Sequence, residues 1–448
     1  MGEKIFNLIL IFSMVLISFG SAWAAPAATN DSWEVTVGKA TDDGVSLDSM
    51  FPKVVYVHAG DTVTFTNGAA VTPHTVTFLS GAAPLSPVDP KNMAPNAPSG
   101  VQWNGKTLLN TGILEPTKQY AITFSSSGAF SYYCILHPLM AGTVVVLPKG
   151  EPIPSKAEQA ARAKAETDDL IEQANALKFA KKEIQVAKNE DGTFTYRLEA
   201  GVGLRGFSVN QMLPETLYVS EGDSVEWLND NPYEPHFITF NKPADLNFFL
   251  PGGAFHPKFM APAGGTSFNG TGFTNSGLIP PTKSYKLAFT KPGTYQYECY
   301  LHSGDKMRGT IVVAPKDAIK VVVNGKPLMY NYKLPHIHNN QVYVGLDTFA
   351  EALGGTVTVD KARNDVMLNI GGHFPAPKEL KNVGDFAVVA NGKQLLYGFE
   401  PAPHLHDGRH FAPVQELVRL LGGSYGWDES TQTFTAILPN HSAVPIQR

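Results

Sequence analysis

The 448-residue chain has little cysteine and little charge. Cys134 and Cys299 are its two cysteines, and charged residues make up 17% of the sequence. The formal net charge is -5, and no run of Lys or Arg offers a face for phosphates, so nucleic acid is not an expected partner. No stretch reaches the roughly 20 apolar residues that a membrane-spanning helix needs, so we expect no transmembrane span.

The N-terminus predicts export. Lys4 precedes an apolar run from Ile5 to Phe19, and the small residues that follow, Ser21-Ala22-Trp23-Ala24-Ala25, contain an Ala-x-Ala cleavage pattern. We interpret residues 1–24 as a cleaved signal peptide. The mature protein is then extracellular, periplasmic or held in the cell envelope.

Two regions of the chain are copies of one domain. Pro73-His74 matches Pro235-His236 at an offset of 162 residues, and Cys134 matches Cys299 at an offset of 165. Short runs that alternate apolar and polar residues between Gly, Pro and Asn predict antiparallel β-sandwiches over residues 31–149 and 190–316. Exported proteins often form disulfides. A Cys134–Cys299 bridge is nevertheless disfavoured, because the same interior point of both sandwiches would have to meet.

Residues 150–189, between the copies, predict a helical linker. Ser155-x-x-Glu158 is a capping box, and the Ala-, Lys- and Glu-rich stretch after it contains no Gly or Pro up to Lys182. Such a helix would act as a strut unless it folds back along a sandwich.

Residues 317–448 contain a separate repeat. Asn324-Gly325-Lys326 recurs as Asn391-Gly392-Lys393, and Leu353-Gly354-Gly355 as Leu421-Gly422-Gly423. Each unit has one apolar helix face at i, i+3, i+4 and i+7, made by Leu346, Phe349, Ala350 and Leu353, and by Val414, Leu417, Val418 and Leu421. The sequence therefore predicts an α+β module of two repeats, and a mainly β protein as a whole.

Each sandwich carries a set of candidate metal ligands. Two imidazoles, one thiolate and a distant thioether form the ligand set of a blue-copper electron-transfer centre. The alternative, that each His and Met is an ordinary loop or core residue, has to account for the same set occurring twice. We predict two type 1 coppers per chain, one bound by His74, Cys134, His137 and Met140, the other by His236, Cys299, His302 and Met307.

At these residues both copies resemble cupredoxins, the plastocyanin and amicyanin family. The loop Cys134-x2-His137-Pro138-x-Met140 resembles that of amicyanin, and Cys299-x2-His302-x4-Met307 resembles that of plastocyanin. The resemblance covers most of residues 50–147 and 212–314. It implies a Greek-key sandwich with copper near one end and the downstream His, here His137 or His302, closest to solvent. The family often has Asn directly after the upstream His, where this chain has Thr75 and Phe237.

The C-terminal region resembles a module found at the N-terminus of some copper amine oxidases and, repeated, in exported bacterial proteins. The Asn-Gly-Lys and Leu-Gly-Gly repeats carry the resemblance, together with Asp360 and Asp428. That module is not the catalytic part of the oxidase, so amine oxidation is not inferred. An association with the cell envelope through this module is a further expectation.

These features predict an electron carrier that transfers single electrons to or from a redox partner protein, docking on an apolar rim around His137. A copper-binding or copper-delivery protein without electron transfer is the main alternative, because it needs the same ligands. A multicopper oxidoreductase is less favoured, since such enzymes join two copper centres through a His beside the Cys, and here Tyr133 and Ile135 flank Cys134. Neither a Ser-His-Asp nor a paired-carboxylate arrangement indicates an enzyme.

A second kind of metal site is expected in the C-terminal repeats. His336 and His338 in one C-terminal repeat match His404 and His406 in the other. Residues i and i+2 of a strand share a face, so the two pairs would converge on Cu(II) or Zn(II) if the repeats pack about a pseudo-twofold axis. The alternative is that these are ordinary polar side chains beside turns.

Overall fold

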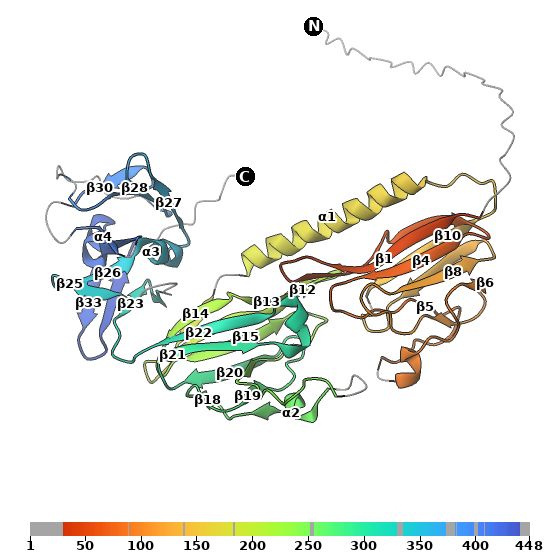
Figure 1. Cartoon of the computed structure of the whole chain (residues 1–448). Coiled ribbons are helices and arrows are strands. Elements are labelled where there is room, and N and C mark those ends of the chain that lie inside the picture. The colour runs from red at the N-terminus through yellow and green to blue at the C-terminus, as the bar shows by residue number, and fades with distance from the viewer. Residues whose placement is uncertain are drawn as a thin grey trace, which may run out of the picture.

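The computed structural model describes residues 30–87, 89–137, 139–181, 184–250, 255–328, 335–372, 381, 383–397, 402–406 and 408–439. The expected signal peptide lies outside these residues. Figure 1 shows two β-sandwiches end to end, a long helix α1 along them, and a smaller α+β part beyond the second sandwich. Among the described residues, no helix is both long enough and apolar enough to cross a membrane.

The predicted sandwiches are confirmed. The first packs two layers, β2(Val45–Phe51), β1(Ser32–Ala40), β4(Thr62–Gly68), β8(Gln119–Phe124) and β6(Val101–Trp103) against β3(Val54–His58), β10(Ala141–Leu147), β9(Gly128–Tyr133), β5(Thr77–Phe78) and β7(Leu109–Asn110). A short 3-10 helix, η1(Pro90–Met93), lies between β5 and β6. Strands β4 and β10 alternate buried and half-buried side chains, which is the pattern that a sheet with one face on the core requires.

The second sandwich repeats this arrangement. Its layers are β13(Phe207–Leu213), β12(Phe194–Leu204), β11(Gln185–Lys188), β15(Ser224–Asp230), β20(Ser284–Phe289) and β18(Ser267–Phe268), packed against β14(Thr216–Ser220), β22(Arg308–Ala314), β21(Gly293–Glu298), β16(Thr239–Phe240), β19(Thr274–Ser276) and β17(Pro262–Ala263). Short helices α2(Pro257–Met260) and η2(Tyr300–Asp305) lie in its loops. Strand β11 occupies the end of the segment expected to be linker.

The two sandwiches share one sheet. Strands β2 and β13 pair antiparallel, with Ser46 opposite Ser208 and Val45 opposite Val209, and this pairing joins one layer of each sandwich into an 11-stranded sheet. The junction is therefore held by main-chain hydrogen bonds, which fix the two sandwiches relative to each other more firmly than a flexible linker would.

Helix α1(Lys156–Ala180) begins with the predicted capping box at Ser155 and folds back over this junction. Leu170 and Ala174 are buried against β2 and β13, and burial of a leucine side chain contributes about 2 kcal/mol. The Arg162 guanidinium donates to the Val54 carbonyl, and the Gln159 amide to the Tyr56 carbonyl, both on β3. The helix is thus packed against both sandwiches and is not a free-standing linker.

The C-terminal part contains three four-stranded sheets around a common core. Their strands are β24(Lys326–Pro327), β23(Lys320–Val323), β34(Thr433–Ile437) and β33(Ser424–Asp428); β25(His336–His338), β26(Gln341–Gly345), β32(Arg409–Pro413) and β31(His404–His406); and β27(Thr356–Asp360), β28(Asp365–Asn369), β29(Ala387–Ala390) and β30(Lys393–Leu395). The predicted helices are α3(Leu346–Ala352) and α4(Val414–Leu420), and their apolar faces are buried as expected.

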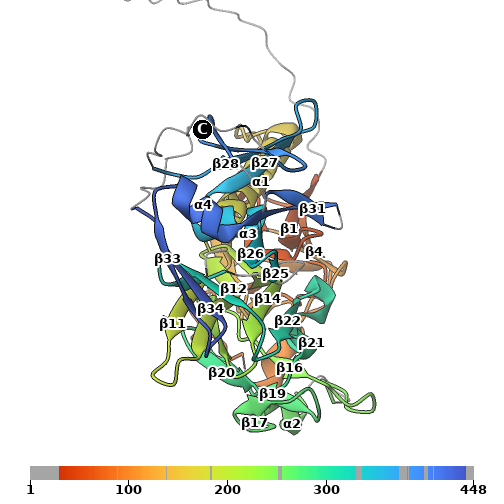
Figure 2. The same ribbon diagram turned by 90° about the vertical axis from the view of Figure 1, so that its left-hand side faces the viewer.

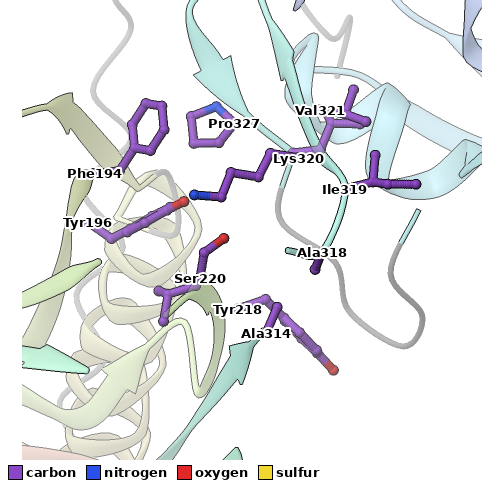
Figure 3. A pocket seen from close by; sticks show the side chains of 12 residues that line it. Phe194, Tyr196, Tyr218, Ser220, Ala314, Ala318, Ile319, Lys320, Val321 and Pro327 are labelled. Atoms are coloured by element: carbon purple, nitrogen blue, oxygen red, sulfur yellow. The ribbon is translucent and has the colours of Figure 1, made fainter. Parts of the chain in front are cut away.

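This C-terminal part packs on the second sandwich. In Figure 2 it lies nearest the viewer, and Val322 of β23 joins the core of the sandwich behind it. Figure 3 shows a small cavity at the contact, in which the Lys320 side chain points toward Tyr196 and Ser220 of the sandwich. None of the predicted metal ligands lines this cavity.

Candidate metal centres

The first sandwich brings His74, Cys134 and His137 together. The Cys134 Sγ lies 3.5 Å from His137 Nδ1 and 3.8 Å from His74 Nδ1, and the two Nδ1 atoms are 3.2 Å apart. Cys134 follows β9 directly, whereas His74 is placed by an isolated bridge to Leu114. All three ligand atoms lie within 4.8 Å of one another, so they could bind one metal ion.

The second sandwich repeats this geometry with His236, Cys299 and His302. The Cys299 Sγ lies 3.5 Å from His302 Nδ1 and 4.0 Å from His236 Nδ1, and the Nδ1 atoms are again 3.2 Å apart. Both cysteines are fully buried and free, so the disulfide argued against from the repeat is absent.

Both methionines lie beside their cysteines. The Cys134 N–H donates to the Met140 carbonyl at 2.9 Å, and the Cys299 N–H donates to the Met307 carbonyl at 2.9 Å. These bonds close the ligand loops, although the second loop is two residues longer. The Met140 and Met307 side chains are buried in the same core clusters as the cysteines. Their role as axial ligands remains a prediction.

Hydrogen bonds support each sulfur. The Thr75 N–H donates to the Cys134 Sγ at 3.3 Å, and the Phe237 N–H donates to the Cys299 Sγ at 3.4 Å. Burial opposes ionisation of Cys134, but hydrogen bonds and charge interactions with His137 and His74 outweigh it and hold the pKa of the thiol well below its usual range. The site therefore favours a thiolate, the form that binds metals.

The residue after the upstream histidine distinguishes the two sites. The Thr75 hydroxyl accepts a hydrogen bond from the Ile135 N–H at 2.8 Å, which ties the two ligand loops of the first site together. Phe237 cannot accept such a bond, and its ring packs edge-on against Phe248 instead. Thr75 and Phe237, which stand where the family often has Asn, therefore give the two sites different contacts: a hydrogen bond between the ligand loops in the first and aromatic packing in the second.

Two glycines that the sequence reasoning missed press on the upstream histidines. A Cβ at Gly38 would lie 2.3 Å from His74 Nε2, and one at Gly201 would lie 2.1 Å from His236 Nε2. Both have positive φ and sit at register shifts in β1 and β12. An isolated Gly inside a strand pattern, which is a signal for close backbone approach, could have identified them.

The downstream histidines face each other across the junction of the sandwiches. The His137 Nε2 lies 3.1 Å from Glu234 Oε1, and the His302 Nε2 lies 3.6 Å from Glu234 Oε2. The exposed fractions of the His137 and His302 side chains are 11% and 6%. These imidazoles are still the ligands closest to solvent, as expected, because His74 and His236 have no exposed surface. Each sandwich nevertheless covers most of the other's site, so the expected docking rim around an accessible His137 does not hold in this arrangement.

Glu234 was also missed by the sequence reasoning. It directly precedes Pro235-His236, and its counterpart in the first copy is Thr72, before Pro73-His74. The sequence signal that could have identified Glu234 is its charge, because the equivalent residue of the first copy, Thr72, is uncharged.

The C-terminal histidines also converge. The ring centroid of His336 lies 5.9 Å from the ring centroid of His404 and 5.5 Å from that of His406. The ring centroids of His338 and His404 are 5.7 Å apart. Strands β25 and β31 are the two edges of a four-stranded sheet, which at about 4.8 Å per strand would separate them by roughly 14 Å if the sheet were flat. The rings therefore lean across the two inner strands or the sheet curls. Metal binding by this cluster stays a prediction.

The donor sets suit the predicted metal. Each sandwich supplies two imidazole nitrogens and one sulfur that point at a common space, with a buried methionine beside them. The Nε2 atoms of His74 and His236 are buried with no hydrogen-bond partner among the described residues, and the glycines hold these rings so that Nδ1 faces the sulfur. A mixed nitrogen and sulfur set of this kind fits copper.

Comparisons with known proteins agree with this chemistry. The family described as "Copper binding proteins, plastocyanin/azurin family" matches residues 41–147 and 204–314. Amicyanin of Paracoccus denitrificans is 30% identical over 139 residues, which are 30% of this chain and 88% of that protein. Chloroplastic plastocyanin of Physcomitrium patens is 26% identical over 155 residues, 34% of this chain and 76% of that protein. The crystal structure of amicyanin from Paracoccus versutus shares 25% identity, covers 28% of this chain and 86% of that one, and has a TM-score of 0.18. The chain belongs to the plastocyanin/azurin family of copper binding proteins.

Proposed function

We propose that this protein is an exported blue copper protein that binds one type 1 copper in each sandwich and transfers single electrons to or from a redox partner. The observation that supports this most directly is the duplicated His-Cys-His group. In the proposal, His74, Cys134 and His137 would bind one copper, with the buried Met140 as a weaker fourth ligand, and the equivalent residues of the second sandwich would bind the other.

Bound copper would supply a one-electron couple between Cu(II) and Cu(I). The protein's contribution is a site that changes little between the two states. Main-chain hydrogen bonds close each ligand loop, Gly38 and Gly201 hold the upstream rings, and the ligands are buried in rigid β cores. Such a site limits the reorganisation that would slow electron transfer.

Copper delivery is the alternative function. Burial disfavours it, because Cys134 and Cys299 have no exposed surface and the downstream imidazoles are covered by the opposite sandwich. Metal release would require the sandwiches to separate, against the β2–β13 pairing and helix α1. An oxidoreductase with its own substrate is also less favoured, because neither cysteine has a neighbouring histidine that leads to another copper centre.

The test is metal analysis and visible spectroscopy of the full chain. We expect two coppers, an intense blue colour that bleaches reversibly on reduction, and loss of one thiolate-to-copper band in Cys134→Ser and of the other in Cys299→Ser. The double variant is the control and should be colourless. A colourless Cu(I) complex that exchanges readily would favour delivery, and a single substitution without effect on the spectrum would mean that its sandwich binds no type 1 copper.

We also propose that the C-terminal histidine cluster binds Cu(II) or Zn(II). The support is the convergence of His336, His404 and His406, whose ring spacings are near those of imidazoles that share one metal. Calorimetry on the full chain carrying Cys134→Ser and Cys299→Ser should detect this site, and replacing the three histidines by Ala should abolish it. The matched control is His410→Ala, because that ring packs on Phe386 instead. Equal binding by the cluster variant would contradict the proposal, as would no binding by the parent.

A further inference from the structure

One carboxylate lies between the two candidate copper sites. Its two oxygens are divided between them, Oε1 toward His137 of the first sandwich and Oε2 toward His302 of the second. Each of these imidazoles has its other nitrogen, Nδ1, 3.5 Å from the sulfur of its own site. The path from one ligand set to the other therefore consists of two imidazole rings and the side chain of Glu234.

Glu234 is fixed in this position by its own loop. Its carbonyl accepts a hydrogen bond from the Asn229 side chain at 2.8 Å, and its N–H donates to the Asn231 side chain at 3.1 Å. Pro235 and the candidate ligand His236 follow it directly, so the segment that holds the carboxylate also holds part of the second site. The Glu234 side chain is 13% exposed, which shields its interaction with the imidazoles from solvent.

The tight fit of the two sandwiches maintains this contact. A Cβ at Gly304, in the second ligand loop, would lie 2.0 Å from the Val71 side chain of the first sandwich. In the same loop, the carbonyl oxygen of Asp305 lies 3.0 Å from where a Cβ at Gly44 of the first sandwich would be. The loop that carries His302 is thus pressed against the first sandwich next to Glu234.

We propose that Glu234 is a positioning residue shared by both copper sites, and that it couples them. It orients His137 by accepting a hydrogen bond from its Nε2–H group, and it orients His302 by attracting the Nε2–H side of that ring across 3.6 Å. In both rings this leaves Nδ1 unprotonated and directed at the metal. Its negative charge stabilises the more positive, oxidised form of both sites. Because one carboxylate serves two sites, a change of charge at one copper alters the stabilisation available to the other.

This proposal rests on the proposed function, since it needs copper in both sandwiches. It goes further because Glu234, which is not a ligand, would control the reduction potentials of both sites. The first copy has Thr72 at the equivalent position, so the repeat does not supply a second such carboxylate. Asp48 is a buried carboxylate that also interacts electrostatically with His137, but its two oxygens accept hydrogen bonds from Ser46 and Ser208 rather than from a ligand.

The experiment is redox titration of the copper-loaded full chain and of its Glu234→Gln variant. Glutamine keeps the shape of the side chain and removes its negative charge, so the Cu(II) form loses stabilisation and the reduction potentials of both sites should rise. At each site the equilibrium should shift toward Cu(I) by about tenfold, which is about 59 mV for one electron. Glu172→Gln is the matched control, because it removes an equal charge from the exposed side of α1 and should leave both potentials unchanged.

Coupling is tested in the forms with a single loaded site. In the Glu234 background, emptying the first site with Cys134→Ser should shift the potential of the second, and in the Glu234→Gln background it should not. Unchanged potentials in Glu234→Gln would overturn the proposal, as would equal shifts in Glu172→Gln. Absence of two blue coppers from the parent would instead refute the proposed function, so the two failures are distinguishable.

A measurement on the unsubstituted protein covers the case in which Glu234→Gln does not fold. In the diamagnetic Cu(I) form, nitrogen-15 NMR should show His137 and His302 protonated at Nε2, with N–H exchange at least tenfold slower than at the half-buried ring of His256, whose Nδ1 accepts from the Lys258 N–H. Exchange as fast as that of His256 at either imidazole would overturn the proposal without any substitution.

Discussion

Gly201 is expected to control the second copper site through the space that it leaves empty. The residue has φ +82°, and a Cβ on it would lie 2.1 Å from Nε2 and 2.7 Å from Cδ2 of His236. Gly201→Ala therefore forces the imidazole, or the β12 bulge beneath it, to move by about 1 Å, because heavy atoms of this kind pack at 3 Å or more. His236 is fully buried among packed side chains, so it has no room to retreat.

The magnitude has two parts. A non-glycine residue at positive φ costs about 1 kcal/mol, and overpacking in a dense core adds roughly 1–3 kcal/mol. We therefore expect Gly201→Ala to reduce the free energy of unfolding by about 3 kcal/mol. Gly192→Ala is the matched control, since Gly192 has φ +84° and nothing within 4 Å of the Cβ position, so it should lose only the backbone contribution of about 1 kcal/mol.

The assay combines urea unfolding of the metal-free chain with copper titration in the Cys134→Ser background, where only the second site is coloured. Gly201→Ala should weaken copper binding by about 10–100-fold or shift the thiolate-to-copper band, and Gly192→Ala should do neither. Equal destabilisation by the two substitutions, with equal copper affinity, would refute the argument that the glycine is required by the imidazole rather than by the backbone.

Three further predictions concern the surroundings of the sites. Thr75→Val leaves the Ile135 N–H without its acceptor, so it should cost about 1–2 kcal/mol in urea unfolding and shift the potential of the first site alone; a matching shift at the second site would contradict this. Gly304→Ala should lower the melting temperature by pressing on Val71, and Val71→Ala should restore it; failure of this rescue would mean that the sandwiches are not in contact there. Burial raises the pKa of Glu199 to about 7 from 4.5, so its contribution to stability is present below pH 4.5 and lost as the pH rises through 7. Glu199→Gln should flatten that part of the stability-pH curve, and an unchanged curve would rule out Glu199 as its source.

The sequence predicted the fold class and identified the candidate ligands because both depend on patterns within short segments. Cys134 and His137 are three residues apart in one loop, so any fold that buries the cysteine keeps the imidazole within reach of it. His74 could be added because the same Pro-His pair recurs before the second cysteine. Alternation of apolar residues and the internal repeat predicted two sandwiches, and the apolar helix faces predicted α3 and α4.

The arrangement of the sandwiches could not be predicted in this way. The β2–β13 pairing joins strands about 160 residues apart through main-chain groups, which carry no sequence signature. Helix α1 has polar residues on all sides, so its sequence did not indicate which face would dock on the sheet.

The sequence by itself thus determined the sandwiches, their repetition and the identity of the candidate ligands, because alternation, spacing and residue chemistry are properties of short segments. Only the tertiary structure decided that the two sites face each other, with His137 and His302 on opposite sides of Glu234. The physical reason is that this contact depends on the register of one strand pair and on the close fit of Gly304 under Val71, and packing between distant segments is set by the shape of the whole fold.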